Sequence, residues 1–168
     1  MRLALIGLIC AATAGTATAQ PPAGGSAAPM MKTFESSADV AALIAKAKSE
    51  LKPGQPMLSQ PLLRVAPAGA NLEYRVAPAA ASVHETEIEL FYVIEGSATL
   101  VTGGKLANEK RTNPSNLSGT AIEGGTAQHV AKGDLFMVPE GVPHWFSAFD
   151  APLAVMSVHL PRPAPAAR

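Results

Sequence analysis

The stretch GDLFMVPEGVPHWF, residues 133–146, decides the fold of this 168-residue chain. A Gly-Asp turn signal at 133–134 precedes an apolar run at 135–138, and a Gly-Val-Pro turn follows at 141–143. His144 then opens the next apolar run. A strand-length apolar run between two turn signals is typical of an all-β protein.

Similar short runs cover most of the chain on either side of this stretch. The chain has 14 glycines and 15 prolines, and together they divide its second half into short segments, which suits an all-β architecture better than a helical one. The polar segment 103–125, rich in Asn, Gly, Ser and Thr, is interpreted as a long inserted loop or an irregular hairpin. The expected strands are 62–66, 72–77, 90–94, 98–101, 135–138, 145–148 and 153–159.

The N-terminal part divides into three segments by composition. Residues 1–19 have a positive start, a short apolar core and an Ala-Thr-Ala cleavage site, which predicts a signal peptide. Residues 20–31 are rich in Pro, Ala and Gly and predict a flexible linker. Apolar residues at helical spacing predict a helix within 32–54, capped by Ser36 or Ser37. A β-barrel over 55–160 and a disordered tail over 161–168 complete the expected organisation.

Composition limits the classes of function and the location. The formal net charge is zero and no run of like charges occurs, which argues against a nucleic-acid partner. The apolar core of the signal is too short to span a membrane, and no span is expected in the mature chain. The one cysteine, Cys10, leaves with the signal, so neither disulfides nor thiol chemistry is expected. We expect a periplasmic or secreted protein.

Two histidines and a carboxylate are the main candidates for chemistry. His84 and Glu89 are an odd number of residues apart, so a straight strand would place them on opposite faces. A turn through 85–87 would let them meet, and His144 opens a later strand. Two imidazoles and one carboxylate on three strands form a facial triad if their faces converge.

These residues resemble the two sequence motifs of the cupins, and the resemblance covers roughly 71–160. It implies a double-stranded β-helix, or jelly-roll barrel, here with one N-terminal helix. It also implies that His84, Glu89 and His144 bind one divalent transition metal ion, either Fe, Mn, Ni, Zn or Cu. The matching residues are His84, Glu89 and Gly96 in the first motif, and Gly133, Pro139, Gly141 and His144 in the second.

Three positions depart from the cupin pattern. Ser82 stands where the first histidine of the first motif is expected, Val76 replaces the opening glycine, and Ala148 replaces the closing asparagine. Three family ligands therefore remain of four, and Ser82 is expected to hold a metal-bound water or nothing. His159 would replace the missing ligand if its face points inward; in the alternative it is a structural strand histidine. In the alternative, a degenerate cupin, His84 and Glu89 only hydrogen-bond each other.

Four further residues are candidates for the site or its surroundings. Arg75 either points into the barrel with Glu73, where it would bind a substrate carboxylate, or forms an ion pair on the exposed face. Phe146 is either a core residue or, because it shares a face with His144, lines the pocket. Glu87 is either a solvated turn residue or an alternative carboxylate ligand. His129, beside a turn, is expected on the surface.

The leading functional hypothesis is a metal-dependent enzyme acting on a small polar or carboxylate-bearing molecule. The cupin resemblance implies dioxygenase, isomerase or lyase chemistry, with Glu89 as ligand or base. The alternative is a non-catalytic module that binds or senses a small molecule. A third hypothesis, a purely structural dimeric barrel, would need an interface, and a homodimer is a possible assembly in each case.

Overall fold

The computed structural model describes residues 31–162. The predicted signal peptide, most of the predicted linker and residues 163–168 of the predicted tail lie outside this range. The elements are α1 (Ser37–Glu50), β1 (Met57–Val65), β2 (Ala68–Arg75), β3 (Ala81–His84), β4 (Glu87–Thr102), β5 (Lys105–Ala107), β6 (Lys110–Asn113), β7 (Asn116–Gly119), β8 (Ala121–Glu123), β9 (Thr126–Ala131), β10 (Leu135–Val138) and β11 (His144–Pro161).

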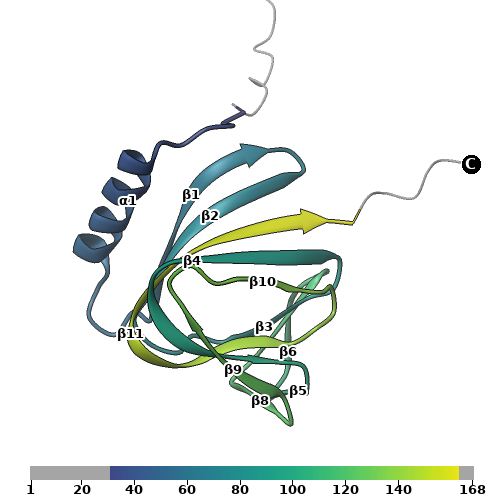
Figure 1. The fold of residues 1–168 in the computed structure, drawn as a ribbon. Coiled ribbons are helices and arrows are strands. Elements are labelled where there is room, and N and C mark those ends of the chain that lie inside the picture. The colour runs from purple at the N-terminus through teal and green to yellow at the C-terminus, as the bar shows by residue number, and fades with distance from the viewer. Residues whose placement is uncertain (1–30, 163–168) are drawn as a thin grey trace, which may run out of the picture.

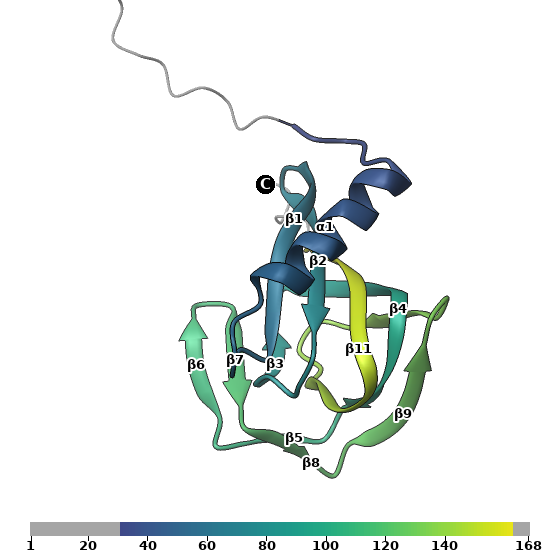
Figure 2. The same ribbon diagram turned by 90° about the vertical axis from the view of Figure 1, so that its left-hand side faces the viewer.

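The strands form a barrel with one helix on its outside, so the predicted fold class is confirmed (Figures 1 and 2). In the larger sheet, one path runs β1-β2-β11-β3-β7-β6, and β4 pairs with β9, β10 and β11. The small second sheet contains β5 and β8. Among the described residues, no helix is long and apolar enough to cross a membrane.

Two long strands, β4 and β11, form an antiparallel ribbon that is folded double. The ribbon is paired from His144 with Thr102 at one end to Pro161 with Glu87 at the other. Register shifts between Phe146 and Val155 bend β11, as bulges do, and both strands curve together at one end of the barrel (Figure 1). Folding the ribbon double brings its two ends to the same side of the barrel.

The fold at the middle of the ribbon depends on Gly96. This residue has φ +80, and a Cβ placed on it would lie 1.9 Å from the carbonyl oxygen of Pro152 on β11. Only glycine allows both this backbone conformation and this close approach. The glycine that ends the first motif is therefore a requirement of the bend.

The apolar core lies in two clusters on opposite sides of the sheet. The inner cluster fills one end of the barrel and consists of Phe91, Val93, Ala98, Leu100, Val130, Val138, Phe146, Leu153 and Val155. The outer cluster packs Ile44 and Ala47 of α1 against Leu62, Leu72 and Tyr74. Ser36 caps α1 and forms a capping box with Asp39, which confirms the predicted start of the helix.

The structure changes the expected strand boundaries in several places. The segment 103–125 contains β5 to β8, with β5 paired to β8 and β6 to β7, so of its two interpretations the long loop is wrong and the irregular hairpin is correct. The individual strands were not predicted because they are short and show no alternation of apolar and polar residues; the four residues of β6 are all polar and exposed. The runs 90–94 and 98–101 belong to one strand, as do 145–148 and 153–159, because bends and bulges do not end pairing. β11 continues through Pro161, where the tail was expected to begin.

Candidate metal centre

Four side chains converge at one end of the barrel, where the two ends of the folded ribbon meet β3. His84 ends β3, and the turn at 85–86 places Glu89 on β4 opposite it, as the sequence predicted. His144 opens β11, and His159 lies near the end of the same strand, in register with Glu89. The 15-residue separation of these two histidines is bridged by the fold in the ribbon.

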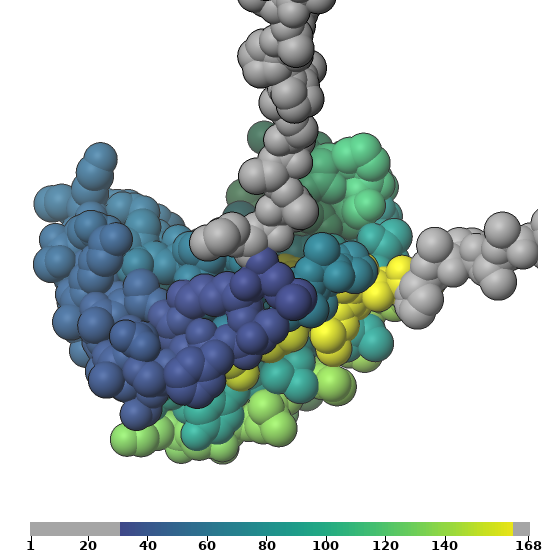
Figure 3. Space-filling view, turned by 90° about the horizontal axis from the view of Figure 1, so that it is seen from above, coloured from purple at the N-terminus to yellow at the C-terminus, as the bar shows by residue number. Residues whose placement is uncertain are grey.

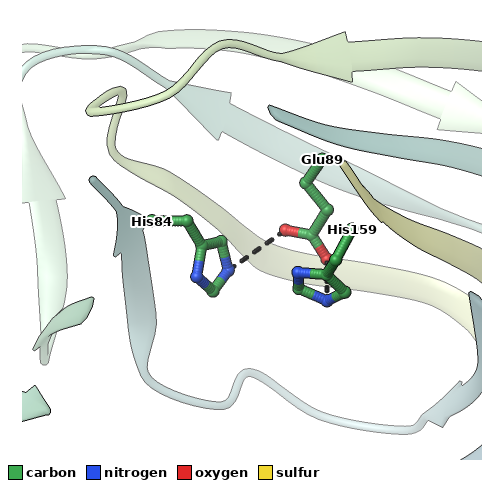
Figure 4. A group of neighbouring side chains, drawn as sticks. All are labelled: His84, Glu89 and His159. Carbon is green, nitrogen blue, oxygen red and sulfur yellow. Dashed lines mark ion pairs between the residues drawn. The ribbon is translucent and has the colours of Figure 1, made fainter. Parts of the chain in front are cut away.

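The Glu89 carboxylate lies at the centre of this cluster. Its Oε2 is 3.2 Å from His84 Nε2 and 3.1 Å from His144 Nε2, and its Oε1 is 3.3 Å from His159 Nε2. Figure 4 shows the carboxylate between the rings of His84 and His159, one oxygen toward each. One ligand atom each from His84, Glu89 and His159 lies within 4.8 Å of the other two.

The Nδ1 atom of each imidazole, which points away from Glu89, contacts an oxygen atom of a neighbouring residue. His84 Nδ1 lies 3.0 Å from Asn116 Oδ1, His159 Nδ1 lies 2.9 Å from Glu87 Oε2, and the Nδ1 of His144 is 3.3 Å from the carbonyl of Val142. Each of these oxygens accepts hydrogen bonds, so each Nδ1 donates. The Nε2 atom of each neutral ring then presents a lone pair to the centre of the cluster.

This arrangement fits a divalent metal ion. Glu89 Oε2 is buried, and despite its short distances to two rings it has no contact with hydrogen-bond geometry among the described residues. Three nitrogen lone pairs and a carboxylate directed at one another repel unless a cation or protons lie between them. Imidazole and carboxylate are suitable ligands for Fe, Mn, Ni, Zn and Cu ions.

The ionisation of the cluster reflects the same crowding. Burial favours the neutral form of Glu89, but its interactions with His144 and His84, and the charge of His159, outweigh burial and hold its pKa well below the ordinary value. The contact with Glu89 raises the pKa of His84 against the effect of burial, with help from Asn116. Without a metal, the cluster therefore retains a proton on His84 to higher pH than a free histidine does.

Two of the four side chains in the cluster are buried, and the other two are partly exposed to solvent. The side chains of Glu89 and His144 are 4% and 7% exposed, whereas those of His84 and His159 are 17% and 26% exposed. A small molecule would therefore approach past His84 and His159. Two surface cavities, of about 400 and 240 Å³, lie on the outside of the sheet, and none of these four residues lines either of them.

The predicted residues Arg75 and Phe146 lie deeper in the barrel. Arg75 Nε and Nη2 donate to Glu73 Oε2 at 2.9 and 2.6 Å, and Ser157 donates to the other oxygen of Glu73 at 3.1 Å. The side chains of Arg75 and Glu73 are 14% and 8% exposed, so an ion pair on the exposed face is the wrong alternative. The Arg75 guanidinium lies 4.9 Å from the ring centre of Phe146, which is buried in the inner cluster.

Three supporting groups or roles were not visible in the sequence. Asn116 lies in the polar segment whose pairing had no sequence signal, and the Val142 carbonyl is a backbone group. Glu87, for which one interpretation was a solvated turn residue, instead contacts His159.

The structure also places the other residues considered in the sequence. Ser82 lies in register with His144 on β11 and Ser118 on β7. His129 is exposed on β9, where it pairs with Asp150.

Removing the groups behind the rings is expected to weaken metal binding without unfolding the barrel. Asn116→Ala and Glu87→Ala should each weaken affinity by about tenfold to a hundredfold, because the ring they hold loses its orientation. Glu123→Ala, which removes an exposed carboxylate of β8, is the matched control. Competition with a chromophoric chelator measures the affinities. Equal affinities in all three variants would contradict this role.

The chain is similar to several solved structures at low sequence identity. The iron(II) form of HppE is 18% identical with a TM-score of 0.49, and the match covers 65% of this chain and 53% of HppE, so this chain spans about half of that length. KdgF from Halomonas sp. is 16% identical with a TM-score of 0.47, covering 68% and 86%. A conserved Klebsiella pneumoniae protein with a double-stranded β-helix domain is 16% identical with a TM-score of 0.49, covering 71% and 84%.

No curated protein shows significant sequence similarity to the chain. The sequence profile of the cupins matches residues 63–166, which is more than half of the chain and includes every residue of the cluster. The chain belongs to the cupin family.

Proposed function

We propose that this protein is an exported cupin that binds one divalent transition metal ion through His84, Glu89, His144 and His159. The observation that carries the proposal is the buried Glu89 Oε2, which faces two imidazole Nε2 atoms without a hydrogen bond. The set keeps the three ligands that the sequence predicted and adds His159. His159 would supply the imidazole that the family motif loses at Ser82.

We further propose catalysis on a small polar or carboxylate-bearing molecule, of dioxygenase, isomerase or lyase type. A bound metal would act as a Lewis acid that orients the substrate. Among the two roles expected for Glu89, its position favours ligand over base, because both carboxylate oxygens face ring nitrogens on the closed side of the cluster. His84 and His159 border the approach, and Glu73 holds Arg75 behind them.

The alternative function is a non-catalytic module that holds a small molecule. One observation favours it: the guanidinium proposed to bind a substrate carboxylate already has Nε and Nη2 on Glu73. Metal content of the purified protein, followed by turnover of small carboxylic and hydroxy acids with each added metal, separates the two. Turnover that requires the metal supports the enzyme, and tight ligand binding by metal-free protein supports the module.

The pH dependence of metal binding follows from the raised pKa of His84. Because a metal binds only the neutral ring, protons should compete with it at pH values above 6.5, the ordinary value for histidine. Affinity should therefore fall continuously as the pH is lowered from 8 toward about 5. Isothermal titration in buffers of different ionisation enthalpy should show proton release on binding at neutral pH. Binding that is independent of pH over this range would contradict the assignment of His84.

Metal affinity should rise with pH, but the stability of the metal-free protein should fall as the pH rises above neutrality. The raised pKa of His84 contributes stability below 6.5 that is lost as the pH rises through its folded value. The lowered pKa of Glu89 contributes stability above 4.5 that is lost as the pH falls through its folded value. The stabilisation gained on adding metal should thus grow with pH between about 5 and 8, as melting curves with and without metal can show.

We also propose export to the periplasm or outside the cell, supported by the sequence of residues 1–19. Cleavage after Ala19 would give a mature chain that starts at Gln20. The intact mass of protein from its natural host tests this directly. A mass corresponding to the uncleaved chain in the cytoplasmic fraction would contradict export.

A further inference from the structure

Arg64 lies in the same row of inward-facing residues as two members of the cluster. The register pairs Glu89 of β4 with His159 of β11, and His159 with Gly69 of β2. Gly69 in turn pairs with Arg64 of β1. Directly paired residues share a face of the sheet. Because Glu89 and His159 face the inside of the barrel, Gly69 and Arg64 belong to that face as well.

The neighbours of Arg64 in β1 agree with this direction. Leu63 and Val65 line the surface cavity of about 240 Å³ on the outside of the sheet. Side chains alternate along a strand, so Arg64, which lies between these two residues, points to the inner face. Arg64 is exposed to solvent, and the C-terminal part of β11, yellow in Figure 3, also reaches the molecular surface. A small molecule can therefore reach this end of the row.

Gly69 leaves space for the guanidinium of Arg64 beside His159. A Cβ built on Gly69 would lie 3.2 Å from Arg64 Nη1, so the guanidinium lies over the glycine, where a side chain would otherwise stand. Adjacent strands are about 4.8 Å apart, which places the guanidinium about one strand spacing from His159.

Three hydrogen bonds hold the guanidinium in this position. Arg64 Nη1 donates to the carbonyls of Leu63 and Ala70 at 2.7 and 2.8 Å, and Nη2 donates to Asn71 Oδ1 at 2.8 Å. A guanidinium has five N–H donors. The N–H of Nε and one N–H of Nη2 donate to no acceptor within residues 31–162, so both are available to a ligand.

The charge of Arg64 sets it apart from the other arginines of the described chain. Arg75, Arg111 and Arg162 each form an ion pair with a glutamate. Within residues 31–162, Arg64 forms no ion pair, and its three acceptors are neutral oxygens. A guanidinium that neutral groups hold in place, without an anion of its own, is suited to bind an anion from solution.

We propose that Arg64 binds a carboxylate group of the small molecule that the metal centre receives. The inference rests on the proposed function, of which it names the substrate class. It gives Arg64 the role considered for Arg75, whose Nε and Nη2 already donate to Glu73. The planar guanidinium matches a carboxylate in shape as well as in charge. One strand spacing, about 4.8 Å, is a length that the carbon chain of a small dicarboxylate can span, so the other end of the molecule would face the cluster.

Isothermal titration of the purified protein with malonate, succinate and glutarate, and with the uncharged succinamide, tests this site. We expect the wild type to bind at least one of the dicarboxylates and to bind it more tightly than succinamide. Arg64→Met keeps the length of the side chain but removes its charge, and should weaken dicarboxylate binding by about tenfold to a hundredfold. Asn71→Asp should have an effect of the same size with the guanidinium still present, because the new carboxylate would pair with it.

The matched control is Lys132→Met, which removes one exposed positive charge at the turn between β9 and β10. It should bind the dicarboxylates as the wild type does. Equal affinities of the wild type and Arg64→Met would overturn the proposal, as would an equal loss in the control. A wild type that binds none of the three dicarboxylates would also overturn it.

The metal content of the same samples distinguishes this proposal from the proposed function. Arg64→Met and Asn71→Asp should carry as much metal as the wild type, because neither residue is among the four ligands. Loss of metal in either variant would overturn the proposal, since Arg64 would then act on the cluster itself. Succinate binding that depends on Arg64 in a protein without metal would contradict the metal centre but support the carboxylate site. A full equivalent of metal with binding that is independent of Arg64 would do the reverse.

Discussion

Replacing His159 with alanine is expected to reduce the metal content of the purified protein from about one equivalent per chain to a small fraction of that. His159 Nε2 is 3.3 Å from Glu89 Oε1, and Glu87 holds its ring in that direction. Losing one of the three imidazoles weakens binding more than losing a supporting hydrogen bond does. His84→Ala and His144→Ala should have effects of the same size. Elemental analysis after dialysis against metal-free buffer measures all three.

The control for these variants is His129→Ala, since His129 is exposed on β9 and, within residues 31–162, forms an ion pair only with Asp150. Its metal content should equal that of the wild type. A His159→Ala protein that retains a full equivalent would return the site to the three ligands that the family motifs predict. Loss of metal in only the His84 and His144 variants would likewise show that His159 is not a ligand.

A rescue experiment tests whether His159 takes the place of the missing motif histidine. Ser82 precedes His84 by two residues on β3 and is in register with His144, so its side chain lies on the face of the cluster. Ser82→His in the His159→Ala background should restore metal binding, because it returns an imidazole to the motif position. Ser82→Ala should change binding little. Failure of the rescue, with the fold intact by circular dichroism, would mean that His159 and position 82 are not equivalent.

Gly96→Ala is expected to destabilise the protein by about 3 kcal/mol or more, the largest effect on folding among our predictions. The added methyl group would lie 1.9 Å from the Pro152 carbonyl oxygen, and the residue would have to adopt φ +80. The ribbon would open at its bend, and metal binding should weaken because the bend brings His144 and His159 together. Urea denaturation of the metal-free protein measures the change in free energy of unfolding.

Gly133→Ala distinguishes the two causes of the expected loss of stability in Gly96→Ala, which are the close contact with Pro152 and the positive φ. Gly133 also has positive φ, +94, but a Cβ there would meet nothing within 4 Å. This variant should lose about 1 kcal/mol, the cost of the backbone conformation alone. Equal losses at the two positions would show that the close approach to Pro152 contributes nothing.

Much of this protein could be predicted from its sequence, because the information is local. The turn, strand and turn at 133–144 and the apolar run at 90–94 depend on residue types at short spacing, and both occur as expected in β10 and β4. The meeting of His84 with Glu89 required only the turn between them. The capping box at Ser36 and Asp39 is equally local. Turn and capping preferences act within a few residues, so a sequence shows them directly.

The remaining parts of the site depend on contacts between distant segments. His159 joins the cluster because the ribbon of β4 and β11 folds double at Gly96 and Pro152, which no local pattern in β11 indicates. Asn116 reaches His84 from β7, in a hairpin where alternation of apolar and polar side chains is missing. Whether Arg75 faces the barrel or the solvent depends on which face of β2 packs inward. The sequence by itself determined the fold and three candidate ligands, and only the tertiary structure decided which further side chains surround them, since the register and bending of long strands are set by packing across the whole barrel.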